Sequence, residues 1–201
     1  TAIYPLATIE RIRAVTAAHG IPMHLDGARL FNAIAATTLP PAAYAQHFDT
    51  LSVCLSKGLG APAGSLLMMN DLSLLDKAKR LRRMYGGAMR QSGILAAAGI
   101  YALEHHIGRL KEDHDHAKRL ARQLQQIPTV RISHQDIDTN IVIFDVIGHR
   151  LSPPAIVTAL KQEGVLINAI GGTRFRAVTH LDVSGAMTEE ACEIFSRVLG
   201  E

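Results

Sequence analysis

The hydrophobic positions in the first part of the chain predict helices and strands in alternation. Leu6–His19 has apolar residues at helical spacing, and the short apolar run Ile21–Leu25 predicts a buried strand. The pattern then predicts a helix over Ala28–Ala36, a break at Pro40-Pro41, and strands over Thr50–Leu55 and Gly64–Met69. Helices that alternate with short strands in this way are typical of a parallel α/β sheet.

The remaining sequence predicts mainly helices, followed by shorter elements. A basic helix is expected over Asp71–Met84, and a long helical stretch over Ser92–Ile127 with an interruption near His106–Gly108. Beyond it, the pattern predicts strands over Ile141–Val146, Val165–Asn168 and Phe175–Thr179, and helices over Pro153–Glu163 and Thr188–Leu199. The change to shorter elements after Thr129 indicates a domain boundary in or just after the long helix, near residues 110–128.

Composition adds few constraints to this picture. Hydrophobic residues make up 48% and charged residues 19%, as in folded globular proteins, and the scarcity of aromatics (4%) predicts an aliphatic core. A net charge of +3 could indicate an anionic ligand, but an excess this small is typical of ordinary surface composition. The sequence has no apolar run long enough for a membrane span, and the distant Cys54 and Cys192 are expected to be free thiols. We therefore expect a cytoplasmic protein.

Two charged residues follow predicted neighbouring strands. In open α/β sheets, ligands bind beyond the carboxyl ends of the strands, where Asp26 and Lys57 are expected. Lys57 lies among small residues that let a ligand approach closely, and a lysine in such a place can act as a nucleophile toward a carbonyl. Asp26 could favour the protonated form of a pyridine nitrogen. The alternatives are that Lys57 is a solvated loop lysine and that Asp26 caps a helix starting at Ala28.

Longer motifs around these residues resemble a known family. His24–Ala33 resembles the aspartate motif of low-specificity L-threonine aldolases, and Ser52–Pro62 resembles their cofactor-lysine motif. Gly86–Gly93 and Arg176–Asp182 are similar to further segments of that family in the same order. The resemblance runs from about residue 4 to the end of the chain. These enzymes depend on pyridoxal 5'-phosphate, so the resemblance implies the α/β, aspartate-aminotransferase-like fold of pyridoxal-phosphate-dependent transferases. It also implies the C-terminal part of the large cofactor-binding domain with its linking helix over residues 1–120, and a small α+β domain over residues 121–201.

The resemblance also implies roles for individual residues. Lys57 would bind the cofactor as a Schiff base, Asp26 would pair with its ring nitrogen, and Arg29 would contribute to cofactor binding. Arg29 and Arg176 would hold the carboxylate of the amino-acid substrate, since guanidinium groups bind carboxylates in a bidentate manner. Arg174 lies on the same strand face as Arg176 and is a less favoured candidate.

The implied reaction cleaves L-threonine, L-allo-threonine or related β-hydroxy-α-amino acids to glycine and an aldehyde. Such enzymes are homodimers or homotetramers. Secondary site candidates are Arg83, Arg90 and His24, which shares a strand face with Asp26. The sequence departs from the family at Arg83, where a lysine is frequent, and at Ala88, which replaces a glycine.

Other functions are less well supported. The basic residues of 77–90 have no interleaved aromatic besides Tyr85, which favours a solvated helix face over a nucleic-acid site. The four histidines at 105, 106, 114 and 116 have no metal-ligand spacing, so we expect them on a solvated helix surface and expect no metal.

Family members begin well before the segment that aligns with Thr1, so we expect this chain to be the C-terminal part of such an enzyme. The alternatives left open are another pyridoxal-phosphate enzyme of this fold (aminotransferase, racemase or β-eliminating lyase), a non-catalytic domain, and an inactive fragment.

Overall fold

The computed structural model describes residues 2–133 and 137–200. The chain forms two compact units, one over Tyr4–Gly108 and one over Arg109–Glu201, which also includes the first residues up to Ile3. The domain boundary expected between residues 120 and 121 falls within the helix Leu110–Leu124 of the second unit. This boundary therefore remains a prediction. In the described part of the chain, no helix is both long and apolar enough to cross a membrane.

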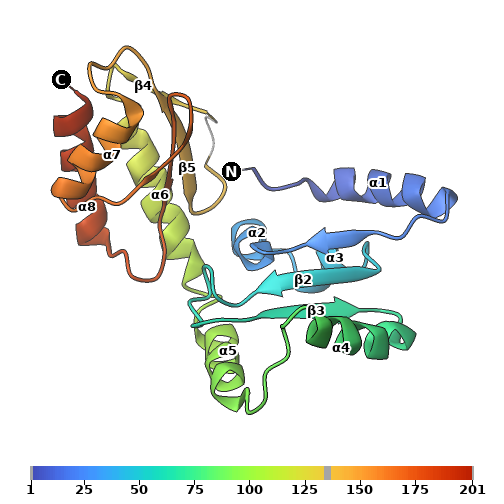
Figure 1. Cartoon of the computed structure of the whole chain (residues 1–201). Helices are drawn as coiled ribbons and strands as arrows, with labels where there is room; N and C mark the ends of the chain where they lie inside the picture. Colours follow the sequence, from blue (N-terminus) through green and yellow to red (C-terminus); the bar gives the residue numbers. More distant parts are fainter. Residues whose placement is uncertain (1, 134–136, 201) are drawn as a thin grey trace. The chain divides into compact units, whose positions relative to one another are not determined.

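The N-terminal unit is built around a three-stranded sheet (Figure 1). Strand β1 (His24–Asp26) pairs in parallel with β2 (Thr50–Cys54), which pairs in antiparallel with β3 (Ser65–Met69). The helices of this unit are α1 (Leu6–Ala18), α2 (Leu30–Thr37), α3 (Pro41–Ala45), the short 3₁₀ helix η1 (Leu72–Leu74), α4 (Leu75–Met84) and α5 (Gly93–His105). Its core includes Leu51 and Val53 of β2, which pack with Ile9, Leu30, Tyr44 and Phe48 from the helices and loops around them.

Most predicted elements of this unit are confirmed, with four differences. The helix predicted over Asp71–Met84 begins as the 3₁₀ helix η1, and α4 starts at Leu75. The first strand is His24–Asp26, in which only Leu25 is partly buried, and Ile21 before it is 55% exposed, so the prediction of a buried strand over Ile21–Leu25 is wrong in both bounds and burial. Helix α3 follows the expected break and begins at Pro41, since proline fits the first turn of a helix. Helix α2 begins at Leu30, because Ala28 and Arg29 form a turn in which the amide of Leu30 donates to the carbonyl of Gly27 at 2.8 Å. Asp26 is therefore not the helix cap that the sequence allowed.

The C-terminal unit places an antiparallel sheet against three helices. The sheet order is β4-β5-β7-β6, formed by Val130–Ile132, Ile141–Val146, Arg174–Val178 and Asn168–Gly171 respectively. The helices are α6 (Leu110–Leu124), α7 (Pro153–Gln162) and α8 (Gly185–Leu199). The expected interruption of the long helical stretch is confirmed, since α5 ends at His105 and α6 begins at Leu110.

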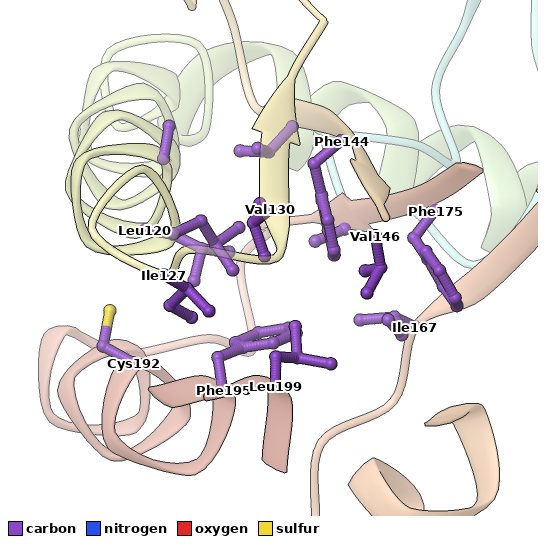
Figure 2. Packing of buried hydrophobic residues seen from close by; sticks show 14 of the residues in the cluster. Leu120, Ile127, Val130, Phe144, Val146, Ile167, Phe175, Cys192, Phe195 and Leu199 are labelled. Atoms are coloured by element: carbon purple, nitrogen blue, oxygen red, sulfur yellow. The ribbon is translucent and has the colours of Figure 1, made fainter. Parts of the chain in front are cut away.

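The core of this unit is partly aromatic, which corrects the prediction of an aliphatic core. Phe144 and Phe175 stack with ring centroids 5.6 Å apart, and Phe195 of α8 meets Phe144 edge to face at 5.9 Å (Figure 2). All three rings are fully buried. Three of the five phenylalanines of the sequence thus lie in one core, which overall composition does not reveal.

Local hydrogen bonds explain the remaining differences in this unit. The predicted strand Val165–Asn168 is wrong in position: the amide of Val165 still bonds to Leu160 of α7, and the strand that forms is β6, from Asn168. Helix α8 begins before the predicted Thr188, because the side chain of Ser184 caps it by accepting from the amide of Met187. The short strand β4 was not predicted.

Candidate functional site

Asp26 is held close to the neighbouring strand by the glycine that follows it. Strands β1 and β2 are parallel, with Asp26 opposite Ser52, and the amide of Gly27 donates to the carbonyl of Ser52 at 2.8 Å. A β-carbon at Gly27 would lie 2.6 Å from that carbonyl oxygen, so only glycine fits without a shift of the backbone. The Asp26 carboxylate is exposed and accepts from the amide of Ala28 at 3.2 Å.

Lys57 is exposed on a loop whose apolar residues are buried. The loop is closed by three backbone hydrogen bonds: from Leu55 to Gly64 (3.0 Å), from Ala61 to Leu55 (3.0 Å) and from Gly60 to Lys57 (2.8 Å). Leu55 and Ala61 are buried, and Leu59, which lies between them in the sequence, is only 2% exposed. The loop therefore anchors itself through its apolar side chains and leaves the lysine amine outside.

These positions bring the two principal candidates to comparable places in the sheet. Asp26 ends β1, and Lys57 follows β2 within a few residues. Because β1 and β2 are adjacent and parallel, their carboxyl ends point the same way. Arg29 is half-buried in the turn after β1 and occupies the N-cap position of α2. The Lys57 amine and the Asp26 carboxylate are both exposed, and Gly27 lets the backbone of the two strands approach closely. An amine and a carboxylate of this kind suit a ligand that has a carbonyl group and a basic ring nitrogen.

His24 contacts the strand beside it. It lies on β1 opposite Thr50, and its Nδ1 is 2.8 Å from the Thr50 hydroxyl oxygen. The ring is exposed, so its other nitrogen remains open to a ligand. His24 is therefore held against β2 through its Nδ1.

In the C-terminal unit, Arg176 and Arg174 have different environments. Arg174 forms an ion pair with Asp145, which raises its pKa further above the usual range of arginine. Arg176 is half-buried, and its Nε is buried with no hydrogen-bond partner among the described residues. A buried guanidinium nitrogen without a partner is costly, and an anionic ligand would satisfy it. These contacts favour Arg176 over Arg174 as the residue that binds an anion.

The secondary arginine candidates lie on exposed segments. Arg83 is in the last turn of α4, no residue of which is buried, and Arg90 follows the helix and is also exposed. This part of the chain agrees with a solvated basic helix face. The described contacts do not connect Arg83 or Arg90 to Asp26 or Lys57, and they indicate no ligand for either arginine.

The four histidines do not form a metal site, but they are not all on the surface. Within the described ranges, no group of three His, Cys, Asp or Glu residues could hold a metal ion. His114 is only 2% exposed, and burial lowers its pKa, so the prediction of a solvated surface is wrong for this residue. The reason is that α6 turns this side toward the core. His106 contacts the Lys57 loop, which sequence reasoning missed because the contact spans 47 positions.

Two cavities in the C-terminal unit do not involve the candidate residues. One of about 640 Å³ lies between α6 and α8, with Arg119 and Glu189 paired across it at 2.6 Å. The other, of about 260 Å³, is mostly apolar and is lined in part by Ala177 and Phe195. The candidate site is therefore defined by the strand-end residues and not by either of these two cavities.

Comparisons with known proteins agree with the sequence resemblance. The low-specificity L-threonine aldolase of Escherichia coli K12 is 43% identical over 182 residues, which cover 90% of this chain and 52% of that protein. Low-specificity L-threonine aldolase 1 of Arabidopsis thaliana is 35% identical over 191 residues, covering 94% and 53% respectively. The chain thus spans about half the length of the curated relatives it matches.

Solved structures confirm the expected fold. A putative L-allo-threonine aldolase from Listeria monocytogenes superposes with a TM-score of 0.81 at 24% identity, covering 98% of this chain and 56% of that one. A transaminase obtained by ancestral reconstruction superposes with a TM-score of 0.65 at 17% identity, covering 97% and 47%. The fold is that of the aspartate-aminotransferase-like transferases.

Similarity at the level of the family covers most of the chain. Residues 2–147 match the beta-eliminating lyase family, and this segment includes Asp26, Arg29 and Lys57 but not Arg176. The chain therefore belongs to the beta-eliminating lyase family, and its resemblance to the low-specificity L-threonine aldolases is confirmed.

Proposed function

We propose that the protein is a pyridoxal-phosphate-dependent aldolase that cleaves L-threonine, L-allo-threonine and related β-hydroxy-α-amino acids to glycine and an aldehyde. The observation that carries the proposal is the placement of Asp26 at the end of β1 and of Lys57 shortly after the parallel strand β2, with Gly27 in close contact with the Ser52 carbonyl. The names of the similar proteins support the same reaction.

Lys57 and Asp26 would hold the cofactor. The Lys57 amine is exposed on an anchored loop and is suited to bind the cofactor carbonyl carbon covalently. The Asp26 carboxylate would favour a protonated ring nitrogen, and Arg29, three residues further, would contribute a positive charge beside it. When bound, pyridoxal phosphate supplies an electron sink for the negative charge that develops at the substrate α-carbon.

Arg29 and Arg176 would bind the carboxylate of the amino acid. A guanidinium group binds a carboxylate through charge-assisted hydrogen bonds and fixes the orientation of the substrate. The unpartnered Nε of Arg176 supports this role. His24 is a secondary candidate for moving the proton of the β-hydroxyl, because its ring is exposed and held by Thr50. Arg83 and Arg90 remain secondary candidates for ligand contacts.

The organisation of the protein is also part of the proposal. We infer a large cofactor-binding domain that includes residues 1–120 and a small α+β domain over residues 121–201. A cytoplasmic homodimer or homotetramer that acts on a small-molecule amino acid is the expected form, with no nucleic-acid or membrane partner.

Covalent labelling tests the cofactor assignment. The chain is incubated with pyridoxal phosphate, reduced with borohydride and digested, and the modified peptide is identified by mass spectrometry. We expect one principal adduct on Lys57, lost in Lys57→Ala and retained in Lys77→Ala, which removes an exposed lysine of α4. Labelling spread evenly over exposed lysines would contradict the proposal.

Product analysis with L-threonine tests the reaction. Glycine and acetaldehyde in equal amounts are expected from the enzyme. A keto acid or ammonia instead would identify an aminotransferase or an eliminating lyase of the same fold.

A further inference from the structure

Helix α5 packs directly on the loop that carries Lys57. A β-carbon at Gly99 would lie 2.9 Å from the Leu55 side chain, so the helix backbone approaches the start of the loop closely. Ala102, three residues further, is 1% exposed, and His106 follows as the C-cap of the helix. Positions 99, 102 and 106 lie on one face of a helix, and this face is turned toward the loop.

His106 makes a hydrogen bond into the loop. Its Nδ1 is 2.6 Å from the carbonyl oxygen of Leu59, two residues from Lys57. Because a carbonyl oxygen can only accept, Nδ1 must carry the hydrogen, and the contact selects this form of the ring. The neighbouring His105 differs: its ring lies 4.3 Å from that of Tyr101 and is exposed.

The bond completes the turn that presents Lys57. Within this turn, the Lys57 carbonyl accepts from the amide of Gly60 at 2.8 Å, and the Leu59 carbonyl accepts from His106. Leu59 is buried, so its carbonyl would lack a replacement partner from bulk water if the imidazole were removed. Two carbonyls of the turn are thereby fixed, that of Lys57 by the loop and that of Leu59 by the C-cap of α5.

We propose that His106 is a positioning residue that holds the Lys57 loop in place through the Leu59 carbonyl. This inference rests on the proposed function, in which Lys57 binds the cofactor. His106 acts on the lysine through the backbone of the loop and needs no contact with substrate.

Three variants separate the hydrogen bond from packing and from general destabilisation. His106→Phe keeps a ring near Tyr101, which meets His106 edge to face at 5.5 Å, but removes the donor. His106→Asn removes the ring and restores an N–H donor near the position of Nδ1. His105→Ala is the matched control on the adjacent residue, which donates no hydrogen bond to the loop.

Amide hydrogen exchange of the full chain without cofactor tests the proposal. The amides of Leu55, Gly60 and Ala61 close the loop and report its opening. We expect His106→Phe to accelerate their exchange by about ten-fold relative to amides of β2, while His106→Asn and His105→Ala stay within about three-fold of the parent. Unchanged loop exchange in His106→Phe, or equal acceleration throughout the unit, would overturn the proposal.

A second measurement links the loop to the lysine. The initial rate at which pyridoxal phosphate is trapped on Lys57 by borohydride is expected to fall several-fold in His106→Phe and to recover in His106→Asn. Equal trapping rates in the three variants would contradict a positioning role. If the parent chain is not labelled at Lys57 at all, the proposed function fails, and hydrogen exchange still decides whether His106 holds the loop.

Discussion

Asp145 and Arg174 lie directly opposite one another on β5 and β7, and their side chains form a forked ion pair. Nη2 of Arg174 is 3.0 Å from Oδ2 of Asp145, and its Nε is 3.3 Å from each carboxylate oxygen. Two residues along β7, Arg176 lies opposite Ile143 on one side and Asn168 on the other. The sheet thus gives one arginine a carboxylate neighbour and the other only neutral neighbours, which leaves Arg176 able to bind an external anion.

This difference predicts opposite roles for the two arginines. Arg176→Lys keeps the charge but loses the planar fork, and Arg176→Ala loses both. If Arg176 binds the substrate carboxylate, its replacement by alanine should reduce kcat/KM for L-threonine by about 10- to 100-fold, the loss of about 1.5–3 kcal/mol from a charged hydrogen bond. The kcat/KM of Arg176→Lys is expected to lie between that of the parent and that of Arg176→Ala.

Arg174→Ala is the matched control for this experiment. Because its guanidinium is engaged with Asp145, we expect kcat/KM to stay within about three-fold of the parent, in keeping with the small energy of exposed ion pairs. Steady-state kinetics of the four proteins make the comparison, and an equal loss at both positions would argue against the assignment.

A carboxylate at position 168 should give Arg176 a cross-strand ion pair like the one that Arg174 forms with Asp145. In Asn168→Asp, the new side chain lies opposite Arg176 and competes with the substrate carboxylate. A partly exposed pair contributes up to about 1 kcal/mol, so the KM for L-threonine should rise by up to about five-fold with little change in kcat. Asn168→Ala controls for loss of the amide, and a KM increase of the same size in that variant would point to another cause.

Gly27→Ala should strain the junction between β1 and β2. The added β-carbon would meet the carbonyl oxygen of Ser52 at 2.6 Å, and backbone cannot move aside as a flexible side chain can. Overpacking of this kind costs about 1–3 kcal/mol, which thermal unfolding would show as a lower Tm. We also expect slower labelling of Lys57, because Asp26 adjoins the shifted residue.

Gly108→Ala provides the comparison, since no atom lies within 4 Å of its added β-carbon. A Tm close to that of the parent is expected there. Equal losses in the two variants would show that the close approach at Ser52 is not the cause.

Stability at low pH should depend on Asp49. Its carboxylate accepts from Arg13 at 2.7 Å and from the amide of Met23 at 2.7 Å, and the Arg13 contact is the main cause of its lowered pKa. A lowered pKa in the folded state means that the unfolded chain binds the proton more readily. The stabilisation is therefore present above the unfolded pKa of about 3.9 and is lost as the pH falls through the lower folded value.

Urea unfolding between about pH 5 and pH 2 tests this dependence. We expect Asp49→Asn to be less stable at pH 5 and to lose less stability on acidification than the parent. Asp76→Asn is the control, because that carboxylate is almost fully exposed and lies 3.8 Å from Lys79. A parallel decline in the parent and in Asp49→Asn would exclude Asp49 as the source.

Local pattern was enough to predict much of the fold. The helix from Leu6, the strand at Ile141–Val146 and the interruption after His105 are confirmed, because apolar spacing, glycine and proline act on neighbouring residues. The family and its fold also followed from contiguous motifs, of which those around Asp26 and Lys57 are the longest. The roles of these residues remain predictions.

Tertiary structure decided what depends on distant parts of the chain. His114 is buried because α6 turns that side toward the core, and the pairing of β5 with β7 determines which arginine meets a carboxylate. The contact of His106 with Leu59 likewise joins residues that no local pattern connects. Sequence by itself determined the family, most elements and the candidate residues, since these are encoded in short segments. Which polar groups find partners, and which are left for a ligand, was settled only when the elements packed, because hydrogen bonds and ion pairs depend on the distance between atoms in space.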